Sequence, residues 1–261
     1  MQLPPNKNVY FLSDFHLGVP DAAISLQREK LIVQFLDTVK NDAYAIFLVG
    51  DMFDFWFEYR KVVPRGFVRL LGKLAELSDA GIQLHFFVGN HDMWMNGYFE
   101  KELKIPVYFE PKEFELFGKS FLIGHGDGLG PGDKGYKFIK KVFRNPACNW
   151  LFGILPPAIG VGMADYFSNR SRAKSGNVEE VFLGEENEWL IVYAKEQLKL
   201  AHKDFFVFGH RHLPIDFRLT NNSRYINLGD WISYFTYAVF DGEEMKLLSW
   251  CGQDHKIIRI P

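Results

Sequence analysis

Five apolar runs in this chain each end abruptly in a short polar cluster, and this repeated pattern limits the folds that the chain can adopt. The runs and their polar ends read VYFLSDFH, AIFLVGD, LHFFVGNHD, SFLIGHGD and DFFVFGHRH. Because they are apolar at consecutive positions, they suit central strands that are covered on both faces. The segments between the first three runs carry helix-like apolar spacing, so the pattern indicates β-α-β units.

Helices are expected between these strands because apolar residues recur there at helical spacing. The two stripes comprise Ile24, Leu31, Phe35 and Val39, and Phe67, Leu70, Leu71, Leu74 and Leu77. After Arg224 the apolar runs become short and closely spaced, as in RYINLGD and YAVFDG. This change predicts an antiparallel end to an α/β fold.

Residues 128–203 interrupt the strand pattern with helical material. We therefore expect a core formed by residues 1–127 and 204–261, with 128–203 as an inserted helical cap. Residues 146–164 of the cap contain no charged side chain, and their length would admit a transmembrane helix. The Pro156-Pro157 pair in their middle predicts two short helices instead.

Charge and cysteine content exclude some classes of function. The formal net charge is −2 and the basic residues are dispersed, so the chain lacks the basic surface typical of nucleic-acid binding. Cys148 and Cys251 match no zinc or redox spacing, which favours two free thiols in a reducing compartment, with a single disulfide between them as the alternative. The first residues do not read as a signal peptide. We expect a cytoplasmic protein, and the sequence indicates no obligate protein partner.

The polar clusters supply residues that can bind metal ions. They are Asp14 and His16, Asp51 and Asp54, Asn90, His91 and Asp92, His125 and Asp127, and His210 and His212. Ligands gather at the carboxyl ends of strands in open α/β sheets, so these side chains should meet at one rim. Carboxylate, imidazole and amide donors suit Mn²⁺, Fe²⁺, Zn²⁺ or Ni²⁺, whereas no thiolate is offered.

The spacing of these residues favours a site for two metal ions. Asp14 and His16 lie two residues apart, as do His210 and His212, so on extended backbone each pair would point to one side. Two close cations need a shared anion, and Asp51 is expected to bridge them. A lone Asp or His at a strand end is more often a helix N-cap, turn or packing residue. Seven ligand-type residues at five successive strand ends favour metal binding instead, and they are Asp14, His16, Asp51, Asn90, His125, His210 and His212. His85, His202 and His255 are interpreted as structural.

The ordered series D-x-H, G-D-x-x-D, G-N-H-D, G-H-G-D and G-H-x-H resembles the calcineurin-like metallophosphoesterase superfamily. The resemblance implies a four-layer αββα sandwich of two mixed sheets. It also implies two groups of metal ligands that share Asp51. One group comprises Asp14, His16, Asp51 and His212, and the other comprises Asp51, Asn90, His125 and His210.

Within this superfamily the chain is most similar to the UDP-2,3-diacylglucosamine hydrolases of lipid A synthesis. The likeness rests on FLSDFHLG, GDMFDFW, HGDGLGPGDKGY, NWLFGILPP and NLGDW. It implies a manganese enzyme at the cytoplasmic face of the inner membrane that cleaves a nucleotide-linked glycolipid to UMP and 2,3-diacylglucosamine 1-phosphate. The best-known branch has arginine where this chain has His91, so the chain resembles a variant branch.

His91 is expected to stabilise the leaving oxygen as a protonated imidazole that Asp92 orients. A helix N-cap is an alternative role for Asp92. The uncharged part of the cap offers an apolar surface for acyl chains. The family likeness implies substrate contacts from Asn90, His91, Asp133, Ser171 and His210. Arg172 and Lys174 could bind phosphate groups of the substrate, or they could form an ordinary solvent-exposed charged face.

Two other functions remain open on the sequence. A general phosphodiesterase or nucleotide pyrophosphatase for soluble substrates would keep every metal ligand and use the cap for packing. A metal-free interaction scaffold would be expected to have lost ligands, and none is lost here. A nuclease ranks below both because the basic residues form no run.

Overall fold

The computed structural model describes residues 3–132, 134–160, 162, 181–250 and 256–260, and two six-stranded sheets form its centre. The strands of the first sheet are β1 (Asn8–Leu12), β2 (Ala43–Val49), β3 (Gln83–Phe87), β4 (Val107–Tyr108), β10 (Thr236–Phe240) and β11 (Met245–Ser249). Those of the second are β5 (Lys112–Leu116), β6 (Lys119–Gly124), β7 (Phe205–Phe208), β8 (Pro214–Thr220), β9 (Ser223–Leu228) and β12 (Ile258–Ile260).

Both sheets mix parallel and antiparallel pairs. The first has the order β11-β10-β1-β2-β3-β4, in which β1 to β4 run parallel and β10 pairs antiparallel with β1 and β11. The second has the order β12-β8-β9-β7-β6-β5, in which β6, β7 and β9 run parallel. The predicted antiparallel end of the fold is therefore confirmed for β10 and β11.

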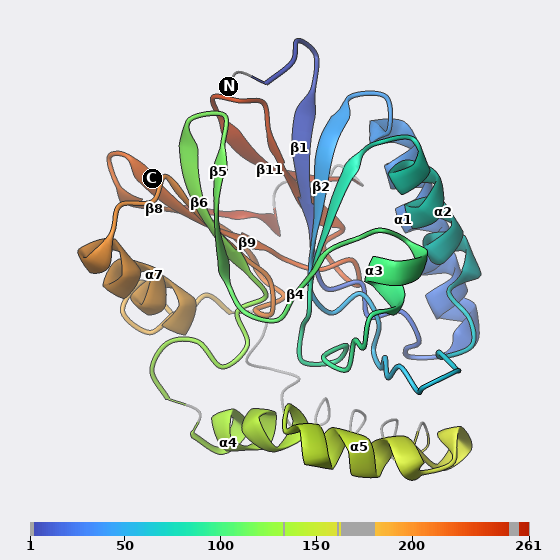
Figure 1. Ribbon diagram of the computed structural model, residues 1–261. Coiled ribbons are helices and arrows are strands. Elements are labelled where there is room, and N and C mark those ends of the chain that lie inside the picture. The colour runs from blue at the N-terminus through green and yellow to red at the C-terminus, as the bar shows by residue number, and fades with distance from the viewer. Residues whose placement is uncertain (1–2, 133, 161, 163–180, 251–255, 261) are drawn as a thin grey trace.

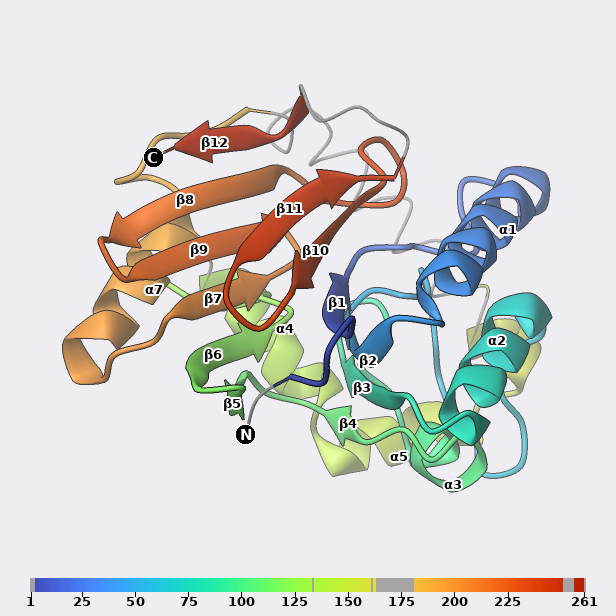
Figure 2. The same cartoon turned by 90° about the horizontal axis from the view of Figure 1, so that it is seen from above.

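Helices cover the outer faces of the sheets. They are α1 (Ala22–Val39), α2 (Val68–Asp79), α3 (Tyr98–Glu102) and α7 (Trp189–Leu200), with α4 (Lys134–Phe143) and α5 (Pro146–Ile154) beyond the ends of the strands. Figure 2 shows α1 and α2 outside the first sheet and α7 outside the second, with the two sheets facing each other between them. The predicted four-layer sandwich is confirmed.

Alternating side chains on the strands build the layers between these elements. Val9 and Phe11 of β1 pack between the two sheets, whereas Tyr10 and Leu12 pack against the helices. The same alternation in β6 sends Leu122 toward α7. Since successive side chains of a strand point to opposite faces, a run that is apolar throughout needs a cover on both sides.

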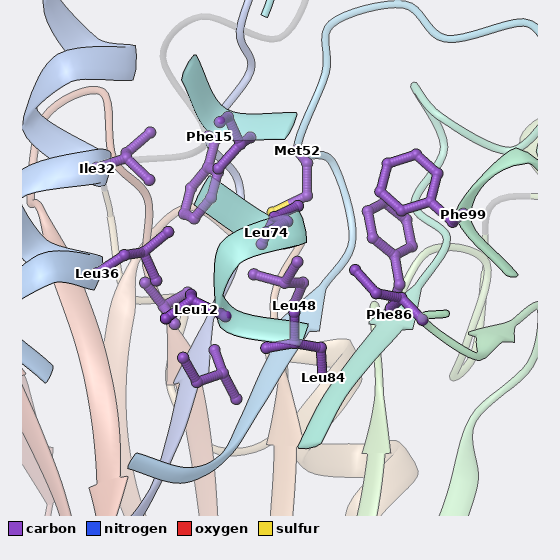
Figure 3. Packing of buried hydrophobic residues seen from close by; sticks show 14 of the residues in the cluster. Leu12, Phe15, Ile32, Leu36, Leu48, Met52, Leu74, Leu84, Phe86 and Phe99 are labelled. Carbon is purple, nitrogen blue, oxygen red and sulfur yellow. The ribbon is translucent and has the colours of Figure 1, made fainter. Parts of the chain in front are cut away.

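The first sheet and its helices enclose a core of leucine, isoleucine and aromatic side chains (Figure 3). Helix α1 contributes Ile32, Phe35, Leu36 and Val39 to this core, whereas Ile24 is 44% exposed. The predicted stripe was therefore wrong at its first member. The buried face of α1 instead continues through Ser25, Arg28 and Glu29, which are polar and escape an apolar periodicity.

Helix α7 belongs to the core in the structure, although the predicted cap extends to residue 203. Leu190, Ile191 and Ala194 of α7 are buried against the second sheet. We therefore propose that the cap ends before α7. The expected division of the uncharged stretch is confirmed at its start, where α5 ends at Ile154 and helical residues resume at 157. Among the described residues, no helix is both long and apolar enough to cross a membrane.

Candidate metal centre

The five polar clusters follow β1, β2, β3, β6 and β7, as predicted. These strands run parallel within each sheet, so their carboxyl ends lie on one side of the molecule, the side on which α4 and α5 lie (Figure 1). Three overlapping groups of side chains there have ligand atoms within 4.8 Å of one another. The groups are Asp14, His16 and His212, then His16, Asp51 and His91, and finally Asp51, His125 and His210.

The first group joins the ends of β1 and β7. The Nε2 atoms of His16 and His212 lie 3.2 Å apart, and Asp14 Oδ1 lies 3.6 Å from the first and 3.4 Å from the second. His16 and Asp14 are almost completely buried, whereas the His212 side chain is 18% exposed. Three donor atoms thus converge on one point at the edge of solvent.

Asp51 connects this group to the ends of β3 and β6. Its Oδ2 atom lies 3.7 Å from His16 Nε2 and 3.2 Å from His125 Nε2. Asn90 Oδ1 lies 3.3 Å from the same nitrogen of His125, and the His210 ring lies 5.1 Å from the His125 ring. Asp51 is therefore the carboxylate that stands between the two groups, which is the position expected for a bridge.

The backbone of this rim differs from the extended conformation predicted for it. Asp14, His16, Asp51, His210 and His212 all have φ between 44° and 66°, the left-handed region. Residues other than glycine seldom adopt this backbone conformation. Where they do, contacts with the surrounding structure hold the strained backbone in place. Each predicted pair does reach one cluster, but through left-handed turns rather than through strand geometry.

Glycine beside these residues allows the close packing of the two sheets' loops. A Cβ on Gly50, whose φ is 87°, would collide with the His125 ring. A Cβ on Gly89 would collide with the Asp51 carboxylate. The glycines of the G-D and G-N-H-D motifs are therefore required for side chains from separate strands to approach one another.

Hydrogen bonds on the far side of the rings orient two of the imidazoles. His125 Nδ1 lies 2.9 Å from the carbonyl oxygen of Val49, and His212 Nδ1 lies 3.3 Å from Asp230 Oδ2. Both partners are acceptors, so Nδ1 carries a proton, and Nε2 is the nitrogen whose lone pair can face a cation in the cluster. This tautomer is the one that a metal ion requires.

The electrostatics of the cluster fit bound cations. Asp14 Oδ1 is buried without a hydrogen-bond partner in the described part of the chain, although two imidazole nitrogens face it. Burial opposes charge on His16 and His125, but the surrounding carboxylates, among them Asp14 and Asp51, outweigh it and raise the pKa of each ring to about 10. The carboxylates thus demand positive charge at this point, which divalent cations would supply.

The contacts of His91 and Asp92 correct one expectation. Asp92 accepts hydrogen bonds from the backbone N–H groups of Gly89 and Met52, at 2.7 and 2.8 Å, and does not orient the His91 ring. His91 Nδ1 lies 2.9 Å from the carbonyl oxygen of Asp54 and 3.6 Å from its carboxylate. Burial lowers the pKa of His91 and, together with the charge of Asp51, raises that of Asp92 to about 7. The prediction that Asp92 orients the His91 ring was therefore wrong, because the contact is made by Asp54 instead.

Some residues that support the site were not assigned a role from the sequence. Asp54 Oδ1 lies 3.5 Å from His16 Nδ1, and Asp230 holds His212. Arg28 of α1 donates to the carbonyl oxygens of residues 15, 16 and 19 and so supports the loop that carries His16. NLGDW contains Asp230 at a strand end, so its sequence position was the available signal.

Some of the remaining residues named from the sequence lie outside the described part of the chain, and the others lie away from the metal cluster. Asp133, Ser171, Arg172, Lys174 and His255 lie outside the described residues. His85 has the structural role expected of it, since its ring stacks on Phe47 at 4.4 Å and its Nδ1 lies 3.1 Å from the Tyr108 hydroxyl. His202 is on the surface, away from the cluster, near Asp204.

Comparison with known proteins gives relatives along almost the whole chain. The model of the family described as calcineurin-like phosphoesterase matches residues 7–214. A UDP-2,3-diacylglucosamine hydrolase of Porphyromonas gingivalis is 43% identical over 92% of this chain and 97% of that protein. One of Shewanella baltica is 29% identical over 92% of this chain and 95% of its own. Among solved structures, the E. coli phosphoesterase Yfce matches with a TM-score of 0.46 and 15% identity, covering 93% of this chain and 92% of that one.

Proposed function

Since this chain belongs to the calcineurin-like phosphoesterase family, we propose that it hydrolyses the pyrophosphate of UDP-2,3-diacylglucosamine to UMP and 2,3-diacylglucosamine 1-phosphate. Two observations carry this proposal. The metal-ligand motifs meet in one cluster, and the chain aligns almost end to end with a hydrolase of that name. The reaction is the lipid A step that the sequence resemblance implied.

Two divalent cations fit the donor atoms of the cluster, and we assign Mn²⁺ first among Mn²⁺, Fe²⁺, Zn²⁺ and Ni²⁺. Asp14, His16, Asp51 and His212 would hold one ion, and Asp51, Asn90, His125 and His210 the other. When bound, such a pair lowers the pKa of water and neutralises charge on the phosphoryl oxygens. The protein then contributes alignment: buried carboxylates and ring tautomers fixed at Nδ1 hold the donor atoms in place before substrate arrives.

His91 is placed to act on the leaving oxygen. Its Nδ1 is held by the Asp54 carbonyl, which leaves Nε2 as the ring nitrogen for the substrate. The side chain is 20% exposed at the edge of the cluster, so it can reach a group that enters from solvent. We propose that the ring acts in its protonated form, in which Nε2 donates a hydrogen bond to the oxygen that leaves with the lipid 1-phosphate.

The cap supplies an apolar surface on the same side of the molecule as the cluster. Phe152 of α5 contacts the rings of Phe57 and Trp94 at 4.8 and 6.1 Å, and these contacts join the cap to the core. Outward from this contact, Phe138, Trp150, Leu151 and Ile154 are 59–67% exposed. We propose that this surface receives acyl chains and rests on the cytoplasmic face of the inner membrane.

The substrate assignment is tested by the rate and position of cleavage. In water enriched in ¹⁸O we expect the label in UMP, because attack on the phosphorus nearer uridine forms the new P–O bond there and releases the unlabelled lipid phosphate. Mass spectrometry of both products measures this. We expect kcat/KM for the lipid to exceed that for bis-p-nitrophenyl phosphate by about 10³-fold, since remote binding energy accelerates the reaction of the true substrate.

Equal values of kcat/KM for the two substrates would favour the general phosphodiesterase, the runner-up function. Label in the lipid phosphate would show attack on the other phosphorus and would also contradict the proposal. A chain with no manganese-stimulated hydrolysis of either compound would instead favour the interaction scaffold.

The membrane assignment predicts that the double variant Phe138→Ser/Trp150→Ser binds vesicles of phosphatidylethanolamine and phosphatidylglycerol at least about tenfold more weakly. Each side chain is 67% exposed and would lose its apolar burial in the interface. Sedimentation with the vesicles measures the bound fraction. Val68→Ser/Leu200→Ser is the matched control, because both residues are more than 70% exposed on helices of the core. Equal losses in the two double variants would count against a cap-specific surface.

A further inference from the structure

Arg211 lies between the two predicted ligands His210 and His212, yet its side chain is buried with 1% exposure. Its guanidinium donates from Nε to Glu188 Oε2 at 3.1 Å and from a terminal nitrogen to Glu188 Oε1 at 3.2 Å. The Glu188 carboxylate is equally buried. A two-point contact between buried charges fixes the orientation of both groups.

Glu188 stands at the start of α7 but does not cap it. The side chain makes no hydrogen bond to the first N–H groups of the helix, and it accepts from Arg211 and from the backbone N–H of Leu183 instead. Glutamate is also not among the preferred N-cap residues. Arg211 further donates to the carbonyl oxygen of Val181, and its guanidinium lies 5.4 Å from the Trp189 ring centre. The arginine is therefore tied to residues 181–189, the segment where the chain returns from the cap.

The backbone around Arg211 has a conformation that needs such support. His210 and His212 have φ of 66° and 55°, and the Arg211 N–H donates to the Gly209 carbonyl oxygen at 2.7 Å in a tight turn. Left-handed residues other than glycine persist where the surroundings over-determine them. The His210 N–H bond to Asp14 supports this turn from the cluster side, at 3.0 Å. The ion pair with Glu188 ties the middle residue of the same turn to the start of α7.

We propose that the Arg211–Glu188 pair is a positioning device for the metal centre, which holds the His210 and His212 rings where they can bind their ions. Arg211 is not itself a ligand, because a guanidinium offers only N–H donors and this one is held by the Glu188 carboxylate. The inference rests on the proposed function in one respect, the use of His210 and His212 as metal ligands. The new element is that the Mn²⁺ affinity of the metal centre depends on Glu188, a residue of the segment that returns from the cap.

The experiment titrates Mn²⁺ alone into the full chain after chelation, with calorimetry as the readout. We expect Arg211→Met to weaken Mn²⁺ binding about tenfold or more, the loss typical when a group that orients a metal ligand is removed. Arg211→Lys keeps the charge but loses the two-point contact, so an intermediate affinity is expected. Glu188→Gln keeps the shape of the side chain but removes its charge, and it should also weaken Mn²⁺ binding. If Arg211→Met does not fold, the Mn²⁺ affinity of Glu188→Gln tests the proposal in its place.

Arg224→Met is the matched control. Arg224 makes a comparable two-point ion pair with Asp216 across β8 and β9, away from the metal cluster. If the Arg211–Glu188 pair served stability alone, Arg211→Met and Arg224→Met would both lower the melting temperature. At temperatures where the chains stay folded, their Mn²⁺ affinity would then equal that of the wild type. Wild-type affinity in a folded Arg211→Met chain, or an equal fall in Arg224→Met, would overturn the proposal. Because no substrate is present, failure of the lipid assignment would leave this result unaffected.

Discussion

Replacing Asp51 by alanine is expected to abolish Mn²⁺-dependent hydrolysis and to reduce bound metal from two ions per chain to fewer than one. Asp51 Oδ2 lies 3.7 Å from His16 Nε2 and 3.2 Å from His125 Nε2, so its carboxylate belongs to both halves of the cluster. Removing it deletes the negative charge that two neighbouring dications share. We expect turnover of the lipid substrate to fall by at least about 10³-fold, equivalent to roughly 4 kcal/mol of transition-state stabilisation. Elemental analysis and steady-state kinetics measure the two effects.

Asp42→Ala provides a control for the loss of a carboxylate beside the same strand. Asp42 precedes β2, as Asp51 follows it, and its carboxylate accepts hydrogen bonds from Tyr10 and Asn8 far from the cluster. This variant should be less stable yet retain two ions and normal turnover once folded. Two bound ions in Asp51→Ala would show that the carboxylate does not bridge the site.

The location of the site could be predicted from the sequence because a simple rule governs it. Parallel strands that end in polar residues bring those residues to one edge of a sheet, and the residues at the ends of β1, β2, β3, β6 and β7 do meet. The β-α-β units followed from the same runs, because strands that are apolar on both faces need two covers, whereas the four-layer sandwich was implied by the family resemblance. Neither prediction required knowledge of side-chain contacts.

The conformation of the site could not be predicted in this way. Asp14 and His16 reach one cluster through left-handed backbone, which depends on packing against loops from other strands. The partner of His91 is Asp54 of the β2 loop and not the adjacent Asp92, because Asp92 turns inward to the N–H groups of Gly89 and Met52. Sequence adjacency suggested a contact that the fold gives to a residue 37 positions away.

Buried polar residues explain the other differences. Helix α1 turns Arg28 and Glu29 inward, where Arg28 supports the His16 loop and Glu29 accepts from the backbone N–H groups of Arg69 and Leu70 at the start of α2. Apolar periodicity cannot detect these polar positions, so the predicted buried face of α1 was wrong at Ile24. Arg211 escaped notice for the same reason, since a charged residue between two ligands reads as solvent-exposed until its partner is known.

His91→Ala is expected to retain two bound ions and to lower kcat by about 10²-fold to 10³-fold, the range for loss of a group that assists proton or charge transfer. The His91 ring is held at Nδ1 by the Asp54 carbonyl, and it stands edge-on to the His16 ring at 4.9 Å. A ring in this position can reach the substrate beside the metal ligands without being one of them. Elemental analysis and steady-state kinetics, applied as for Asp51→Ala, measure both quantities.

The structure also allows a competing role for His91, because His91 shares a group of converging ligand atoms with His16 and Asp51. If His91 is a ligand, His91→Ala should lose metal as Asp51→Ala does, and raising the Mn²⁺ concentration should restore its turnover. If it acts on the leaving oxygen, excess Mn²⁺ should leave kcat low, whereas His91→Arg should recover much of it, because arginine can donate to the same oxygen. His202→Ala, which removes a surface imidazole, should change neither metal content nor kcat. The response of kcat to added Mn²⁺ therefore separates the two roles of this residue.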